Sequence, residues 1–229
     1  MDSSYSVPVG ELEARTQGSF LVRVYAQLAL AIVLFVGLEV WFFQSGIANV
    51  VLQFVSGVSW LIVLGGFMLL SWLATMIAVP TVARPLQYVG FALYIILQAL
   101  IFVPLLAVAD QSAPGVIASA AQATLGGFFL LTGVVVVTRK DFSFLRSLIV
   151  WGGLFALVTI VCAVLFGFEL GTWFSVAMVL LAGASVLYTT SNVLQRYPQN
   201  ADVAAALQLF AGIALMFWYV LRLFMGARR

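Results

Sequence analysis

The sequence predicts an all-α, polytopic membrane protein with seven transmembrane helices, and three observations predict it. Of the 229 residues, 64% are hydrophobic and only 8% are charged, whereas water-soluble domains carry about 25% charged residues. The mean hydropathy is +1.17. Seven apolar stretches are each long enough to cross a bilayer, because a spanning helix needs roughly 20 apolar residues. A chain this apolar cannot cover itself with polar surface, so the lipid bilayer is its expected solvent.

The seven spans use up almost the whole length, so we expect a single transmembrane domain over 19–229 that follows a polar cytoplasmic tail over 1–18. The apolar runs are too long and too continuous for the strands of a barrel, which alternate over ~10 residues. Prolines near the ends of runs mark helix boundaries, because a helix interior tolerates proline poorly. The expected spans are 20–43, 54–79, 86–108, 115–138, 144–167, 171–190 and 202–225.

The distribution of lysine and arginine predicts the orientation, because these residues are enriched in cytoplasmic connections. The connections after the first, third and fifth spans hold none. The N-terminal side and the other connections hold Arg15, Arg23, Arg84, Arg139, Lys140, Arg146 and Arg196. We therefore expect the N-terminus in the cytoplasm and the C-terminus outside. Arg228 and Arg229 oppose this pattern, and they leave a six-span or re-entrant arrangement as the alternative.

Composition also excludes several classes of function. The chain has no histidine, which removes histidine-ligated zinc, histidine general bases and histidine proton relays. The hydrolase motifs G-x-S-x-G and H-E-x-x-H are absent. We therefore expect no enzymatic activity, no metal and no cofactor. No basic tail is present to bind nucleic acid, so the bilayer is the one partner that composition indicates, and the oligomeric state stays open.

Ionisable groups inside a span are costly, so each is a functional candidate. Glu39 and Arg222 lie toward the outer ends of the first and last spans, where they either pair with each other or reach water. A polar cluster lies at the inner end of the sixth span. Its side chains either line a water-filled path or cap the helix and bond to neighbouring helices. The cluster consists of Tyr188, Thr189, Thr190, Ser191 and Asn192.

The connection between the fourth and fifth spans is the most distinctive string in the chain. It reads Thr138-Arg139-Lys140-Asp141-Phe142-Ser143 and resembles the T-[KR]-[KR]-D-[FLM]-S connection of the Bax inhibitor-1 family. Two further stretches agree in order with that family: FLVRVY at 20–25 in the first span and LRLFMG at 221–226 in the last. The resemblance covers nearly the whole chain and points to the YccA branch of bacterial inner-membrane proteins.

The resemblance implies a bundle in which the last span is surrounded by the other six. Some family members are pH-sensitive calcium leak channels, in which an aspartate of the sixth span and one of the seventh share a proton beside an arginine of the second. Two such carboxylates form a pH latch. Here the two positions hold Thr189 and Gly212, and 54–79 holds no arginine. The latch mechanism therefore does not transfer, because a threonine hydroxyl does not titrate near neutral pH.

Two functions remain. YccA-type proteins interact with the membrane-bound AAA protease FtsH, so the resemblance implies a modulator of such a protease or of membrane homeostasis. The protease would bind the protein through residues 1–18. The alternative is a leak pathway for calcium or protons without the latch. In that case Thr189, Thr190 and Asn192 would line a neutral path, and acidic residues such as Glu39 and Asp110 would attract cations at the outer mouth. The sequence places the protease role first.

Overall fold

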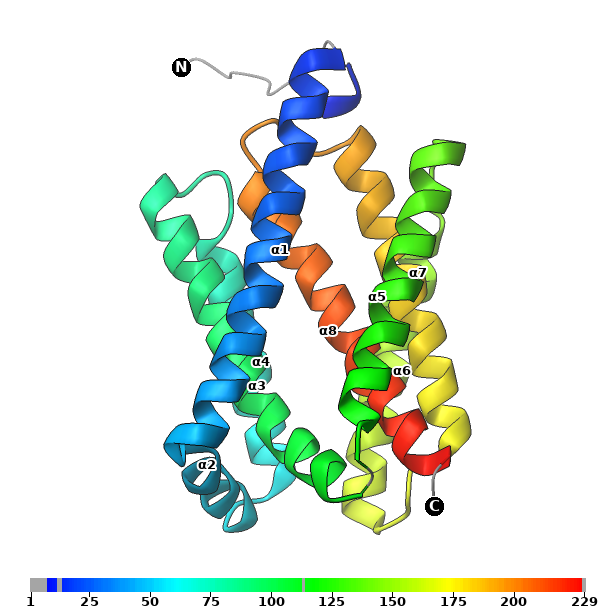
Figure 1. Ribbon diagram of the computed structural model, residues 1–229. Helices are drawn as coiled ribbons and strands as arrows, with labels where there is room; N and C mark the ends of the chain where they lie inside the picture. The colour runs from blue at the N-terminus through cyan, green and yellow to red at the C-terminus, as the bar shows by residue number, and fades with distance from the viewer. Residues whose placement is uncertain (1–7, 12–13, 113, 228–229) are drawn as a thin grey trace.

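The computed structural model describes residues 8–11, 14–112 and 114–227, and this part of the chain is helical (Figure 1). Seven of its helices are long and apolar enough to cross a membrane, which confirms the predicted fold class. They are α1 (Ala14–Ser45), α3 (Trp60–Ile77), α4 (Arg84–Ser112), α5 (Val116–Thr138), α6 (Leu145–Phe166), α7 (Thr172–Gln195) and α8 (Asp202–Ala227). Two short elements complete the order, the 3-10 helix η1 (Val9–Glu11) and the helix α2 (Ile47–Ser56).

The start of the predicted second span is wrong, because residues 54–56 belong to α2. Gly46 ends α1 with a φ of 83°, a left-handed conformation that glycine adopts without steric cost. The chain then forms the ten residues of α2, breaks again, and begins α3 at Trp60. Ten residues are about half of what a bilayer requires. α2 therefore does not span; it packs across the ends of α1 and α4.

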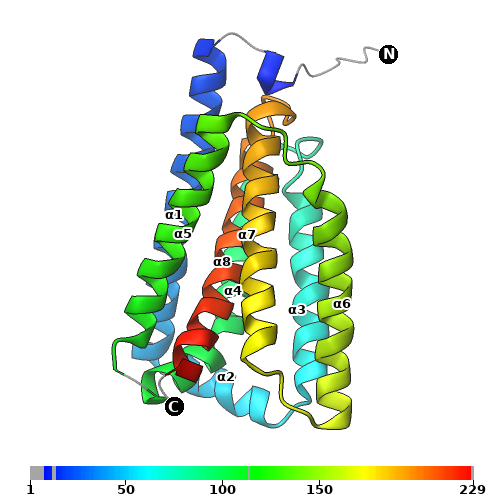
Figure 2. The same ribbon diagram turned by 90° about the vertical axis from the view of Figure 1, so that its right-hand side faces the viewer.

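α8 is the central helix of the bundle, as the resemblance implies. Its main contacts are with α1, α4, α5 and α7, whereas α3 packs on α4 and α6 packs on α7. The ribbon shows α3 and α6 side by side at the periphery (Figure 2). Four of the other six spans thus form the immediate surroundings of α8.

The surface and the core of the bundle are both apolar. Trp173 on α7 and Val137 on α5 are 85% and 83% exposed, which suits a side chain whose solvent is lipid. In the core, aromatic rings from three helices pack on one another. The ring of Phe102 on α4 lies 5.2 Å from that of Phe35 on α1 and 5.0 Å from that of Trp218 on α8, measured between centroids.

The start of α1 and the end of α8 lie at opposite ends of the bundle (Figure 1), as an odd number of spans requires. We name the end with the start of α1 the inner end, after the charge-based prediction, and the other the outer end. α1 begins at Ala14, inside the predicted tail. The rest of that tail is described only over 8–11, and Arg228 and Arg229 lie outside the described residues.

Candidate functional site

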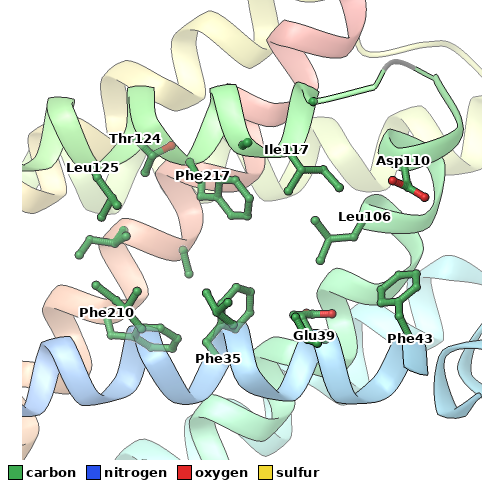
Figure 3. A pocket seen from close by; sticks show the side chains of 18 of the residues that line it. Phe35, Glu39, Phe43, Leu106, Asp110, Ile117, Thr124, Leu125, Phe210 and Phe217 are labelled. Atoms are coloured by element: carbon green, nitrogen blue, oxygen red, sulfur yellow. The ribbon is translucent and has the colours of Figure 1, made fainter. Parts of the chain in front are cut away.

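A cavity of about 710 Å³ lies in the outer half of the bundle, between α1, α4, α5 and α8 (Figure 3). We call it the outer cavity. Its walls are mostly apolar and include four phenylalanine rings, two from α1 and two from α8: Phe35, Phe43, Phe210 and Phe217. Phe35 and Phe210 are buried because α8 is central and α1 packs along it, whereas Phe43 is 42% exposed. The cavity therefore ends on α8, within the core.

Glu39 of α1 is the charged side chain set deepest in this cavity. It is 7% exposed, and neither of its carboxylate oxygens has a hydrogen-bond partner among the described residues. Figure 3 shows the side chain projecting from α1 into the cavity. Burying a carboxylate without a partner is costly, so a position of this kind calls for a function.

Three other polar side chains line the same cavity, and one of them is Gln44 of α1. Asp110, near the end of α4, is exposed at its outer rim. Thr124 of α5 is 1% exposed, and its hydroxyl oxygen has no hydrogen-bond partner among the described residues. The lining contains no lysine or arginine. The outer cavity therefore combines two carboxyl groups, a hydroxyl and an amide with mainly apolar walls, and its acidic groups favour cations.

Glu39 and Arg222 do not pair. Among the ion pairs of the described residues none joins them, and the two side chains line different cavities. Arg222 donates to the carbonyl oxygen of Leu170 at 3.4 Å and lines a second cavity of about 750 Å³ together with Glu169. α8 stands between the two cavities, so each charge meets a different set of helices.

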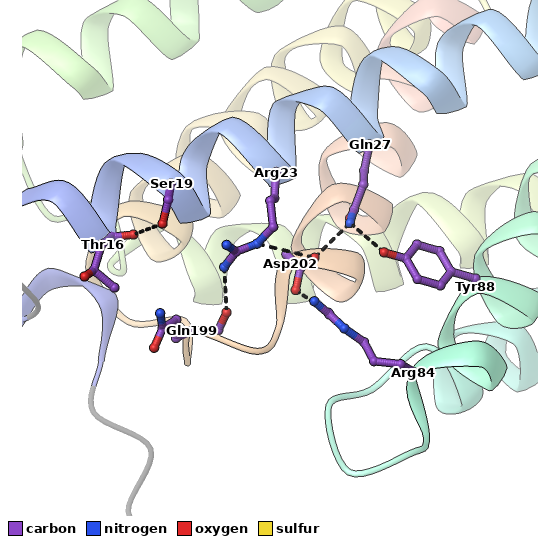
Figure 4. A network of polar contacts seen from close by, with 8 residues as sticks. All are labelled: Thr16, Ser19, Arg23, Gln27, Arg84, Tyr88, Gln199 and Asp202. Carbon is purple, nitrogen blue, oxygen red and sulfur yellow. Dashed lines mark hydrogen bonds and ion pairs between the residues drawn. The ribbon is translucent and has the colours of Figure 1, made fainter.

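The inner end holds a buried carboxylate that sequence reasoning missed. Asp202, the first residue of α8, is 0% exposed. It accepts from Arg84 at 2.6 Å and from the amide of Gln27 at 2.8 Å, and Arg23 lies 4.0 Å away (Figure 4). We call these four residues the inner clamp. It joins α1, α4 and α8 at one point, so the inner end of the bundle is tied by charge.

The signal for this clamp is present in the sequence. Asp202 is an acidic residue at the start of a span, where it also suits the helix dipole. Arg23 and Arg84 lie at the inner ends of two other spans, where the orientation pattern alone already accounts for them. Matching acidic and basic residues at equal depth would have suggested the pair, although it would not have identified which arginine lies nearer.

The family-motif connection, residues 138–143, is held against the inner end of α7. The Ser191 hydroxyl accepts from the backbone N–H of Phe142 at 3.1 Å and donates to the carbonyl of Lys140 at 3.2 Å. Gln195 donates to the carbonyl of Arg139 at 3.1 Å. These bonds give the motif a structural role, which is to fix the turn between α5 and α6 on α7.

Asp141 of the same connection is exposed and paired. It accepts from the backbone N–H of Ser143 at 2.9 Å and from Arg196 at 2.6 Å. Its bonds from the backbone N–H and hydroxyl of Ser143, and then from the Arg196 guanidinium, hold its pKa below the ordinary value. The pair is therefore present at neutral pH and is lost only as the pH falls through that lowered pKa.

The remaining predicted positions lie on α7 and α8, and none of them lines either cavity. Thr189 is 5% exposed, and a Cβ at Gly212 would lie 3.2 Å from a methyl group of Val186, one turn before Thr189. Gly212 therefore faces α7 about one turn before Thr189, and both positions are buried. Thr190, Ser191 and Asn192 are buried and Tyr188 is half-buried, so the predicted polar path stays a prediction.

The first described residues dock against the inner end. The N–H of Val9 donates to the carbonyl of Tyr197 at 2.9 Å, and Pro8 forms an isolated bridge with Pro198. The Val9 side chain is 0% exposed. A Cβ at Gly10 would lie 2.9 Å from the carbonyl oxygen of Gln195. We call residues 8–11 the N-terminal strap, because they hold the chain before α1 on the end of α7.

Metal ligands do not converge in the described part of the chain, where no three histidine, cysteine, aspartate or glutamate side chains come together. The comparison with families is more informative. The family described as "Inhibitor of apoptosis-promoting Bax1" matches residues 17–229, which includes the 138–143 connection and all seven spans except the first three residues of α1. No curated protein matches the chain. With a family match over nearly its whole length and the seven-span fold, the chain belongs to the Bax inhibitor-1 family.

Proposed function

We propose that this multi-pass membrane protein is a leak pathway for cations, calcium or protons, that works without the di-aspartyl latch. One observation carries the proposal: the outer cavity reaches from the outer end to α8 and holds the unpartnered carboxylate of Glu39. Ionisable side chains within spans mark ion pathways, and an acidic mouth raises the local concentration of cations. This function, which the sequence placed second, has the stronger physical support.

The same geometry describes a closed pathway. The lining residues nearest the inner end include Ile32, Phe35 and Phe210, and the rings of the two phenylalanines lie 6.0 Å apart between centroids. Beyond them the inner clamp ties three helices together. Conduction therefore requires these layers to separate. Because Thr189 and Gly212 carry no titratable group, they supply no pH-dependent step.

The test is cation flux into liposomes that contain the purified protein, from about pH 6 to about pH 8. Flux above that of protein-free liposomes is expected, and Glu39→Gln should lower it severalfold because the carboxylate in the cavity is lost. Glu169→Gln, which changes an outer carboxylate of the second cavity, is the matched control. No flux with verified insertion, or flux unaffected by Glu39→Gln, would contradict the proposal.

A second candidate is the role implied by the YccA branch, in a bacterial inner membrane with a cytoplasmic N-terminus. There the protein would modulate an FtsH-like AAA protease, or membrane homeostasis, through its N-terminal residues. The N-terminal strap gives this role a specific requirement. A protease that grips the tail must first break the Val9–Tyr197 bond and expose the buried Val9 side chain.

Two variants test the protease role apart from the leak. Deletion of residues 1–7 should abolish protease-dependent turnover, whereas Val9→Glu should accelerate it because the charge releases the strap. Turnover in cells with and without the protease is the measurement. Neither variant should alter flux in liposomes. Turnover that is equal in the parent and in both variants would rule out a tail-dependent role.

A further inference from the structure

We infer that the outer cavity is a binding site for an amphiphilic organic cation, meaning a cationic head group carried on an apolar or aromatic body. The inference concerns the cavity that the proposed leak also uses, but it does not require that ions pass through the protein. It rests on the shape of the cavity, the chemistry of its walls and the position of Glu39.

The size and the walls fit an organic ligand. Small-molecule sites have volumes of about 300–1,000 Å³ and are mainly apolar, with a few polar groups that fix the orientation of the ligand. The outer cavity has about 710 Å³. Phe35, Phe43, Phe210 and Phe217 present aromatic surface to it, and aromatic faces attract cations as well as apolar groups.

The charge fits a cation. Glu39 is buried and projects into the cavity, and neither of its oxygens has a partner among the described residues. Asp110 adds a second carboxylate at the rim, and the lining holds no basic residue that would neutralise either of them. A cationic head group beside Glu39 would supply the missing partner and favour the ionised carboxylate, which burial alone disfavours.

The same walls are poorly suited to hold a bare metal ion. Calcium takes six to eight oxygen ligands, whereas the cavity offers the side-chain oxygens of Glu39, Asp110, Thr124 and Gln44 among walls of carbon. A cation of low charge density, which brings its own apolar body, needs no such shell. Apolar contact supplies its binding free energy, and the carboxylate selects its sign.

The measurement is equilibrium binding of radiolabelled tetraphenylphosphonium to the full-length protein in nanodiscs of phosphatidylglycerol, after subtraction of protein-free nanodiscs. Tetraphenylborate is the matched control ligand, because it has nearly the same shape and the opposite charge. We expect saturable binding of the phosphonium and none of the borate. Equal binding of both ions would overturn the inference.

Three variants place the site. Glu39→Gln is nearly isosteric and should weaken phosphonium binding about tenfold or more, and Ala121→Phe on α5 should abolish it by filling the cavity. Glu169→Gln should bind like the parent protein, because Glu169 lines the second cavity. The inference would be overturned if neither Glu39→Gln nor Ala121→Phe changed phosphonium binding. Ala121→Phe keeps the test valid if Glu39→Gln does not fold.

A membrane lipid with an amine head group offers the same chemistry as a soluble amphiphilic cation. Nanodiscs that also contain phosphatidylethanolamine distinguish these sources. If this lipid competes with the phosphonium, the lipid is the ligand; if it does not compete, the ligand is a soluble cation. The leak fails separately: a protein that binds phosphonium but conducts nothing contradicts only the leak. A protein that conducts but binds no phosphonium contradicts only this inference.

Discussion

Two buried carboxylates at opposite ends of the bundle differ in their hydrogen-bond partners. Asp202 is surrounded by donors from Arg84 and Gln27, whereas Glu39 has no partner among the described residues. The sequence singled out Glu39 because it interrupts an apolar run. It did not single out Asp202, because an acidic residue at the start of a helix already has a local explanation. Its partners are more than a hundred residues away, where no local pattern reports them.

The inner clamp predicts an asymmetric response to mutation. Arg84→Gln leaves Asp202 buried with Gln27 and the more distant Arg23, so it should lower the free energy of unfolding by about 3 kcal/mol. Asp202→Asn should cost about 1 kcal/mol, because the half-exposed arginines can reach water. Unfolding in mixed micelles measures both changes.

Arg146→Gln is the control for the clamp, since Arg146 is exposed near the same end of the bundle. It should change the free energy of unfolding by less than about 0.5 kcal/mol. If Asp202→Asn proves as costly as Arg84→Gln, the burial of the carboxylate is not what makes the clamp important.

At the scale of elements, hydropathy located the spans but not their ends or the short helix between the first two. Every one of the seven predicted spans overlaps a long helix. α2 was missed because its last three residues, 54–56, resemble the beginning of the next span, and only the left-handed Gly46 and the break before Trp60 mark it as a separate helix. The outer cavity escaped the sequence altogether, since its walls come from four helices.

The 138–143 connection should depend on a single hydroxyl of α7. Ser191→Ala removes the acceptor of the Phe142 N–H and the donor to the Lys140 carbonyl, so it should cost about 1–3 kcal/mol. Hydrogen exchange of the peptide over 138–145 should accelerate. Thr159→Ala, whose hydroxyl bonds only to its own helix at Phe155, is the control, and equal exchange in the two variants would exclude a fixing role for Ser191.

At the scale of the molecule, an odd number of spans places the two ends of the chain on opposite sides of the membrane, and this orientation can be tested. Because basic residues gather at the inner end, alkaline phosphatase fused after Ala227 should be active, and the same enzyme fused at the 138–143 connection should be inactive. Enzyme activity per fused molecule in intact cells is the measurement. The reverse pattern would invert the orientation on which the names inner and outer depend.

One cavity for ions and for an organic cation predicts competition. Tetraphenylphosphonium should reduce cation flux in liposomes, with half-maximal inhibition near its dissociation constant, because it occupies the space that ends on α8. Tetraphenylborate should have no such effect at equal concentration. Full flux at saturating phosphonium would show that the ions take another route.

The central position of α8 has a consequence for how the protein is made. Synthesis begins at the N-terminus, so the helix on which α1, α4, α5 and α7 pack leaves the ribosome after all of them. Until Asp202 is synthesised, Arg23 and Arg84 lack the carboxylate with which both of them pair at the inner end. A nascent chain that lacks α8 therefore lacks the helix on which four of its spans pack. We expect such a chain to be degraded faster than the complete bundle.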